Sequence, residues 1–279
     1  MKKAAITVLK ALIFFAGWLV LVSVINVGDP EKDPVMWRLF AELIPLAAIA
    51  ALTAVFLWFE KGQVRIPLAQ NAGRGILAGL ATGALWLGLA CAIPMCLGFL
   101  FFRKVGQVSY FRVWVLAAFL NVVMQELLIR GYLYQMLRAR HGVAVAAAAT
   151  TALFTLLHGG AIEAGPLAVI NVITMSLFMT ALYEAEGTLL APIMAHGVWN
   201  VVGALFLGTV SLAEDYPSLC EATASGSPLL SGGAYQIEAS LVVTVLNVGL
   251  AAAFFFLAKK RARRGRKGLN REAENGKRI

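Results

Sequence analysis

The chain has 279 residues, of which 60% are hydrophobic and only 14% are charged. Soluble globular domains usually contain about 45–50% apolar and about 25% charged residues, so this composition excludes an ordinary soluble domain. Apolar runs of about 20 residues recur along the chain, and each is long enough to cross a bilayer as a helix. The sequence therefore predicts an all-α fold, a polytopic membrane helix bundle of about eight transmembrane helices.

The apolar segments give the expected helices in chain order. They are 4–27, 37–59, 75–102, 110–137, 143–158, 167–183, 189–210 and 236–258. We expect one integral membrane domain with N-terminal helices in 1–109 and a catalytic core in 110–210. Residues 211–279 then hold an outside loop, the eighth helix and a basic tail.

The positive charge is concentrated near the C-terminus. The formal net charge is +9, and ten Lys or Arg residues fall within 259–279. Because an excess of Lys and Arg marks the cytoplasmic side of membrane proteins, this tail and the pair Lys2 and Lys3 predict that both termini are cytoplasmic. We expect an integral protein of a bacterial inner membrane, with the lipid bilayer as a partner and no nucleic acid.

Two charged residues interrupt the apolar segment 113–137. Glu126 and Arg130 are four residues apart, so they share one face of a helix and can form an ion pair. Charged side chains at this depth are costly and rare, and each is a functional-site hypothesis with its partner. The segment is therefore expected to do chemistry rather than only contact lipid.

Three short patterns carry the polar residues of the expected core. They are Gln125-Glu126-x-x-x-Arg130, Phe154-x-x-x-His158 and His196-x-x-x-Asn200. Each spaced pair lies on one helical face, so three helices can direct a carboxylate, two imidazoles and an amide into one buried cavity. Straight helices would place these groups at different depths, so we expect tilted or broken helices.

The ordered patterns resemble the CPBP family of intramembrane proteases, which includes the CAAX prenyl endopeptidases and bacterial Abi-type proteins. That family carries E-E-x-x-x-R, F-x-x-x-H and H-x-x-x-N/D motifs in this order, and the resemblance covers 113–210. It implies an intramembrane endopeptidase that cleaves a membrane-anchored or lipid-modified peptide or protein. It also implies that the first glutamate, helped by the second motif's histidine, activates the attacking water.

This chain departs from the family at that first glutamate, where it has Gln125. An amide cannot take up the proton of water, so either Glu126 takes the role or the protein cleaves poorly or not at all. In the first case His158 can orient the water or shuttle a proton, and His196 and Asn200 can donate hydrogen bonds to the oxyanion.

Supporting roles are expected for the remaining motif residues. Arg130 can hold Glu126 ionised, which also makes that carboxylate a weaker base. Gln125 can hydrogen-bond Asn121 one turn earlier on the same helix. Phe154 is expected to pack in the core, and Asn121, Asn171 and Asn247 are expected to link helices.

Two alternatives remain open. Glu126, His158 and His196 form a possible two-His-one-carboxylate set for zinc, although H-E-x-x-H is absent. No cofactor is favoured, because Asn200 is a poor zinc ligand and a good oxyanion donor. The second alternative is a non-catalytic membrane protein of the same fold, an immunity or scaffold protein that binds a peptide or partner. Gln125 supports that function, whereas the two histidines and Asn200 support hydrolysis.

Overall fold

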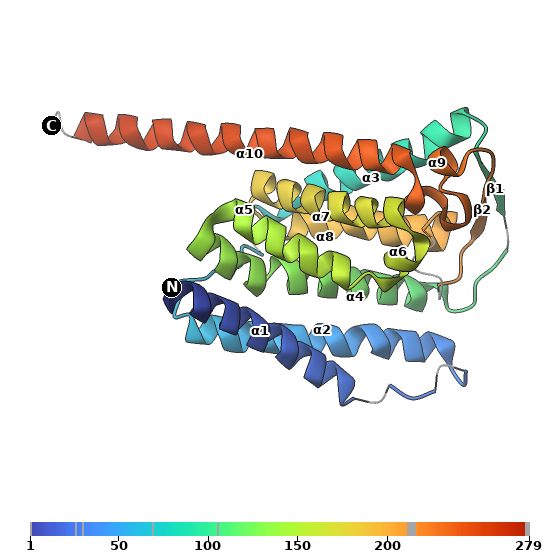
Figure 1. Ribbon diagram of the computed structural model, residues 1–279, viewed down its shortest axis with the longest axis horizontal. Helices are drawn as coiled ribbons and strands as arrows, with labels where there is room; N and C mark the ends of the chain where they lie inside the picture. Colours follow the sequence, from blue (N-terminus) through green and yellow to red (C-terminus); the bar gives the residue numbers. More distant parts are fainter. Residues whose placement is uncertain are drawn as a thin grey trace.

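The computed structural model describes residues 2–25, 27–29, 31–68, 70–104, 106–210 and 216–276. Its elements in chain order are α1 Lys2–Ser23, α2 Pro34–Phe59, α3 Ala72–Cys96, β1 Leu100–Lys104, α4 Phe111–Arg130, α5 Tyr132–Leu156, α6 Gly159–Ala164, α7 Pro166–Glu186, α8 Leu190–Gly197, the π-helix η1 Val198–Leu207, β2 Cys220–Ala224, α9 Pro228–Ser231, the 3₁₀-helix η2 Gly233–Ala239 and α10 Leu241–Gly276. The long helices run side by side, with α1 and α2 on one side and α3 and α10 on the other (Figure 1). Helices α4, α5, α7 and α8 lie between them, so the middle of the chain forms the centre of the bundle.

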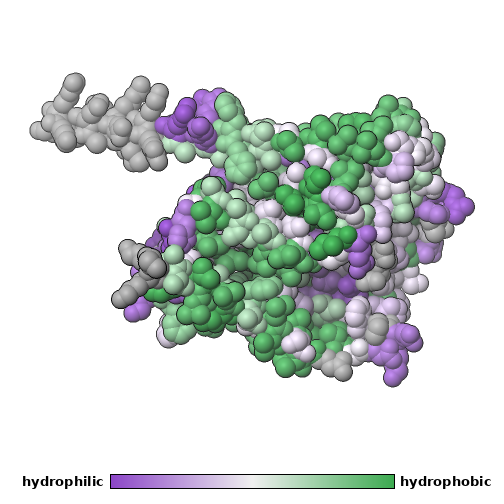
Figure 2. Space-filling view, in the orientation of Figure 1, coloured by the Kyte–Doolittle hydropathy of each residue, from purple (hydrophilic) through white to green (hydrophobic). Residues whose placement is uncertain are grey.

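The surface is that of a membrane protein. Among the described residues, seven helical segments are long and apolar enough to cross a bilayer. Apolar side chains cover the middle of the face shown in Figure 2, and hydrophilic ones gather at its two ends. The prediction of an all-α membrane helix bundle is confirmed. The cytoplasmic position of the termini and the kind of membrane stay predictions.

One segment accounts for the difference between the eight expected helices and the seven found. Phe111–Leu156 is one candidate spanning segment of 46 residues. As one straight helix it would measure about 69 Å, more than twice the bilayer core of about 30 Å. The chain instead breaks at Gly131 and turns at Gly142, where φ is 84°, so that α5 packs back against α4. The expected helix 110–137 was therefore wrong in its end, which falls at Arg130.

Two further expectations are wrong at the opposite end of the bundle from the C-terminus (Figure 1). The expected helix 75–102 ends at Cys96, because Gly98 adopts a left-handed φ of 74° that stops it. Residues Leu100–Lys104 then form β1, which pairs antiparallel with β2. The expected outside loop 211–234 therefore contains a strand and the short α9, while its first five residues lie outside the described part of the chain.

Glycines bring α8 close to α3. A Cβ on Gly79 would lie 2.3 Å from the Ala191 carbonyl oxygen, and one on Gly83 would lie 2.8 Å from that of Ala195. Larger residues would force the two helices apart. Helix α8 then widens into η1, so the expected helix 189–210 is half α-helix and half π-helix. Wide turns of this kind are frequent at functional sites.

A charged cluster joins α1, α2 and α5 beyond the end of the α2 span. The Glu60 side chain is 3% exposed and accepts hydrogen bonds from Lys10 at 2.7 Å, Tyr132 at 2.9 Å and Arg140 at 2.9 Å. Burial raises the pKa of Glu60, but the hydrogen bonds from Lys10 and Tyr132 and the charge of Arg140 outweigh it and hold the pKa below its usual value. This cluster fastens α1 to the rest of the bundle.

Candidate functional site

A cavity of about 310 Å³ lies among the central helices. Its polar wall consists of Asn121, Gln125, His158, His196, Asn200 and Glu238. Its apolar wall includes Trp18 of α1, Leu128 of α4, Met175 of α7 and Trp199 of η1. Five of the seven predicted site residues, which are Gln125, Phe154, His158, His196 and Asn200, therefore line one chamber, although they come from three distant segments of the chain.

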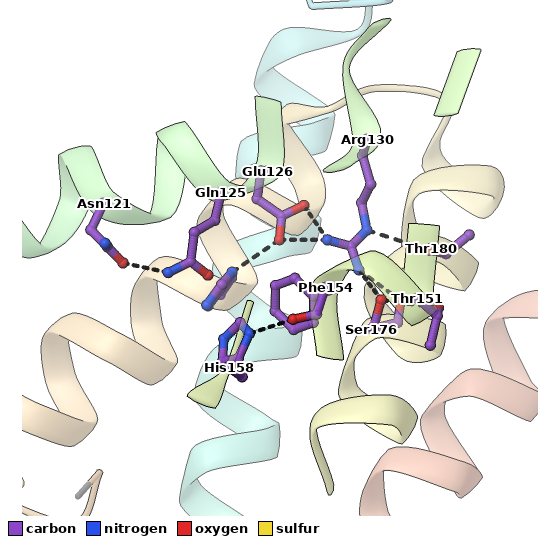
Figure 3. Close-up of polar contacts among 10 residues, drawn as sticks. Asn121, Gln125, Glu126, Arg130, Thr151, Phe154, His158, Ser176 and Thr180 are labelled. Atoms are coloured by element: carbon purple, nitrogen blue, oxygen red, sulfur yellow. Dashed lines mark hydrogen bonds and ion pairs between the residues drawn. The ribbon is translucent and has the colours of Figure 1, made fainter. Parts of the chain in front are cut away.

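Glu126 does not line this chamber but forms a buried ion pair behind it (Figure 3). Glu126 and Arg130 are both 0% exposed, and Nη1 of Arg130 lies 2.9 Å from each carboxylate oxygen. Arg130 also donates to the Ser176 carbonyl oxygen at 2.7 Å and to Thr180 at 3.4 Å. A buried charge needs such partners, so the predicted i,i+4 pair is present with both members satisfied.

The carboxylate of Glu126 also fixes the orientation of His196. Nδ1 of His196 lies 2.9 Å from Oε1 of Glu126, and the imidazole is 2% exposed. An ionised carboxylate can only accept, so Nδ1 carries the proton and donates. In the neutral imidazole, Nε2 is then a hydrogen-bond acceptor, and the His196 side chain is part of the chamber wall.

His158 has the same tautomer for a different reason. It follows the end of α5 and precedes α6, and its Nδ1 lies 2.7 Å from the Phe154 carbonyl oxygen. A carbonyl oxygen only accepts, so Nδ1 donates and Nε2 is again the acceptor. The Phe154 ring is buried and packs against the His158 ring at 4.1 Å between centroids. The F-x-x-x-H spacing thus supplies both a packing surface and the carbonyl oxygen that sets the tautomer.

Gln125 belongs to a chain of hydrogen bonds that leads away from the chamber. Its Nε2 donates to Oδ1 of Asn121 at 2.7 Å, as the sequence predicts (Figure 3). Nδ2 of Asn121 donates to Oε2 of Glu42 on α2 at 2.8 Å. Oε1 of Gln125 is buried and has no hydrogen-bond partner in the described part of the chain. Gln125 is therefore held through its donor side.

Asn200 reaches the chamber from η1, one turn beyond His196. Its side-chain amide makes no hydrogen bond to any residue that the structure describes, and it is partly exposed. It is therefore available as a donor or acceptor for a bound molecule.

Sequence analysis missed two carboxylates, Glu238 at the chamber wall and Glu42, which is connected to Gln125 through Asn121. Glu42 follows Arg38 by four residues, the same spacing that marked Glu126 and Arg130, so a signal was present in the sequence. Glu238 lines the chamber from η2 and accepts a hydrogen bond from Nε1 of Trp199 at 3.4 Å. It lies at the start of the expected helix 236–258, where no pattern distinguished it from a helix end.

The predicted helix-linking asparagines fasten η2 to the bundle. Nδ2 of Asn171 donates to the carbonyl oxygens of Glu238 and Ser240, both at 2.9 Å. Asn247 of α10 donates to the Asn171 carbonyl oxygen at 3.2 Å. Gln236 turns the backbone with φ 50° and ψ −150°. These contacts hold Glu238 at the chamber wall, and the prediction for both asparagines is confirmed.

The predicted zinc set does not converge on one point. Glu126 directs its oxygens to Arg130 and His196, and His158 directs Nδ1 to a backbone carbonyl. Across the described residues, no group of three or more His, Cys, Asp or Glu side chains is placed to hold a metal ion.

Residues 107–202 match the family model of the Rce1-like type II CAAX prenyl endopeptidases. The matched segment is about a third of the chain and contains all seven predicted site residues. No curated protein and no solved structure matches the chain significantly. The resemblance inferred from the three motifs is confirmed for this segment, which is similar to a family of intramembrane proteases.

Proposed function

We propose that this protein is an intramembrane endopeptidase that hydrolyses a peptide bond in a membrane-associated or lipid-modified peptide. The family match of 107–202 supports the reaction class. The observation that carries the proposal is the pair of imidazoles at the chamber wall, each with Nδ1 tied to a fixed acceptor. His158, His196 and Asn200 line the same chamber, and together they can supply the base and the oxyanion donor that hydrolysis of an amide bond uses.

In this proposal His196 is the general base. Its Nε2 takes a proton from water, and the resulting hydroxide attacks the carbonyl carbon of the peptide bond. Glu126 accepts the Nδ1–H hydrogen bond at 2.9 Å and stabilises the imidazolium that forms. Glu126 therefore acts through His196. Its carboxylate oxygens accept hydrogen bonds from Arg130 and His196, and it lies behind the chamber wall.

The remaining groups stabilise and resolve the intermediate. Nδ2 of Asn200 donates to the oxyanion, and such donors act most strongly where water is excluded. Nε2 of His158 accepts the second hydrogen of the attacking water and fixes its position. When the carbon–nitrogen bond breaks, the His196 imidazolium returns its proton to the leaving amine. No step needs a carboxylate at position 125.

The chamber wall also indicates the kind of substrate. Trp18, Leu128, Met175 and Trp199 give it large apolar surfaces next to the polar groups. Such a wall suits an extended peptide with apolar side chains or a lipid attached to the chain. The family described by the match acts on CAAX prenyl substrates, so a prenylated peptide is the first substrate to test.

A second candidate function rests on Gln125. The family places a glutamate at this motif position, and the amide here is held through its donor side by Asn121. A chamber that binds a membrane-anchored peptide without cleaving it would have these features. Such a protein would act by sequestering a peptide or partner.

The test uses purified protein in lipid vesicles and a fluorogenic prenylated peptide that ends in a CAAX sequence. We expect cleavage by the wild-type protein and by His141→Ala, which changes the exposed histidine outside the chamber. His196→Ala should not cleave. Tight binding of the peptide by folded wild-type protein without any cleavage would support the second candidate and refute the first.

A further inference from the structure

A partly buried chain of hydrogen bonds begins at Glu42 and ends at Gln125. Oε1 of Glu42 accepts from Arg38 and from Tyr216, both at 3.2 Å. Oε2 of Glu42 accepts from Nδ2 of Asn121 at 2.8 Å. Every described contact of this carboxylate is a donor, as an ionised carboxylate beside an arginine requires.

The charge of Glu42 sets the direction of the next two amides. Asn121 must turn its NH₂ group towards Glu42, because its carbonyl oxygen would face a carboxylate oxygen. Oδ1 of Asn121 therefore points to position 125 and needs a donor there. Gln125 supplies one with Nε2 at 2.7 Å. An ionised carboxylate at position 125 would place one of its oxygens against Oδ1 of Asn121. Neither atom carries a proton, so no hydrogen bond could form between them.

We propose that Glu42 and Asn121 are positioning residues that make position 125 a hydrogen-bond donor position, so that the chain is built to hold a neutral group there. Gln125 lines the chamber in which we propose that hydrolysis occurs, but the inference about its hydrogen bonds does not depend on that reaction. It means that the amide at position 125 is matched by its surroundings on α2 and α4. A carboxyl group restored at this position alone is held protonated by Oδ1 of Asn121 and cannot act as a base.

The same reasoning shows how a carboxylate could be accommodated. If Glu42 becomes Gln, its new NH₂ group can donate to Oδ1 of Asn121, and the Asn121 amide reverses. Nδ2 of Asn121 then donates towards position 125. Arg38 and Tyr216 still find an acceptor in the new amide oxygen. The pair Glu42→Gln and Gln125→Glu thus reverses the direction of the hydrogen bonds that link positions 42, 121 and 125.

The experiment compares carboxyl protonation by infrared spectroscopy in vesicles at neutral pH. Gln125→Glu should add the carbonyl stretch of a protonated carboxyl group, and Gln125→Glu with Glu42→Gln should not. Gln63→Glu, at an exposed site, is the matched control and should add only an ionised carboxylate. Absence of the protonated band in Gln125→Glu would overturn the proposal.

A second variant covers the case in which the double variant fails to fold. Asn121→Ala removes the acceptor that faces position 125, so Gln125→Glu with Asn121→Ala should also lose the protonated band. Persistence of the band in this variant would overturn the role of Asn121. Both readouts are independent of hydrolysis, so they can succeed even if the protein cleaves no peptide.

Stability gives a further readout of the same coupling. Gln125→Glu should lower the melting temperature of the wild type by about 2–4 °C, and the same change should lower it less in the Glu42→Gln background. Losses that simply add in the double variant would show that positions 42 and 125 are not coupled. In the peptide assay, Gln125→Glu alone should give less than a twofold gain in cleavage, and the double variant should exceed it.

Discussion

Two regions of the bundle contain the same unit, a buried glutamate paired with an arginine four residues away. On α4 Glu126 pairs with Arg130 at 2.9 Å, and on α2 Glu42 pairs with Arg38 at 3.2 Å. Each carboxylate also accepts from a third group. For Glu126 this group is the imidazole of His196, and for Glu42 it is the amide of Asn121.

The third group decides what each unit does to the chamber. An imidazole that donates through Nδ1 keeps a free acceptor at Nε2, so the Glu126 unit makes the chamber wall basic. Because the Asn121 amide donates to Glu42 through its NH₂ group, its oxygen points to Gln125. The Glu42 unit therefore requires a hydrogen-bond donor at position 125. The comparison locates the basic group of the site on His196 and not at the motif position on α4.

The largest effect is expected when the first unit is broken. Glu126→Gln leaves Arg130 charged and fully buried, which should cost about 3–5 kcal/mol of unfolding free energy. Chemical unfolding in detergent measures it, with Glu163→Gln on exposed α6 as the control. Adding Arg130→Met should recover stability but not cleavage. Wild-type stability of Glu126→Gln alone would contradict the importance of the buried pair.

Alanine substitutions of the two chamber histidines should lower kcat by different amounts. His196→Ala removes the proposed base and should lower kcat about 10²–10⁴-fold. His158→Ala removes only a water-positioning acceptor and should cost less. Cleavage of the prenylated peptide measures both, and circular dichroism checks that each variant is folded. If His158→Ala proves the more damaging change, the two roles must be exchanged.

Asn200→Leu should sharpen the assignment of the oxyanion donor. The change keeps the side-chain shape but removes the NH₂ group, so kcat should fall about 10²–10³-fold while KM changes little. Binding of a non-cleavable peptide analogue serves as the control and should be retained. A rise in KM with unchanged kcat would assign Asn200 to substrate binding instead.

A third glutamate, outside the spanning segments, gives the smallest expected effect. The pKa of Glu60 is lowered in the folded protein, so its ion pairs contribute stability above its unfolded pKa of about 4.5. This contribution is lost as the pH falls through the lowered pKa. Each unit of lowering is worth about 1.4 kcal/mol. Melting temperatures from pH 7 to pH 3 should fall less for Glu60→Gln than for the wild type, and equal slopes would contradict the assignment.

Local spacing predicted much of the site because its decisive contacts lie within one helix. Glu126 with Arg130 and Gln125 with Asn121 are four residues apart, and both contacts are present. The convergence of the three motifs was also predicted, since each pattern supplied a polar face to a buried helix. Apolar composition was sufficient for the fold class.

The remaining features depend on contacts between segments distant in sequence. Glu42 meets Asn121 only because α2 packs on α4, and Leu100–Lys104 became a strand only because β2 is available to pair with it. The placement of Glu126 behind His196 depends on the packing of α4 against α8. No single stretch of sequence contains that information.

The tautomer of His196 is the most direct test of the account. The chain has three histidines, so nitrogen-15 histidine labelling with His141→Ala and His158→Ala spectra assigns the signals of His196. At neutral pH in lipid, the account predicts a neutral His196 ring with the proton on Nδ1 and a bare Nε2. A proton on Nε2, alone or together with Nδ1, would contradict it, because His196 would then present no basic nitrogen to the chamber.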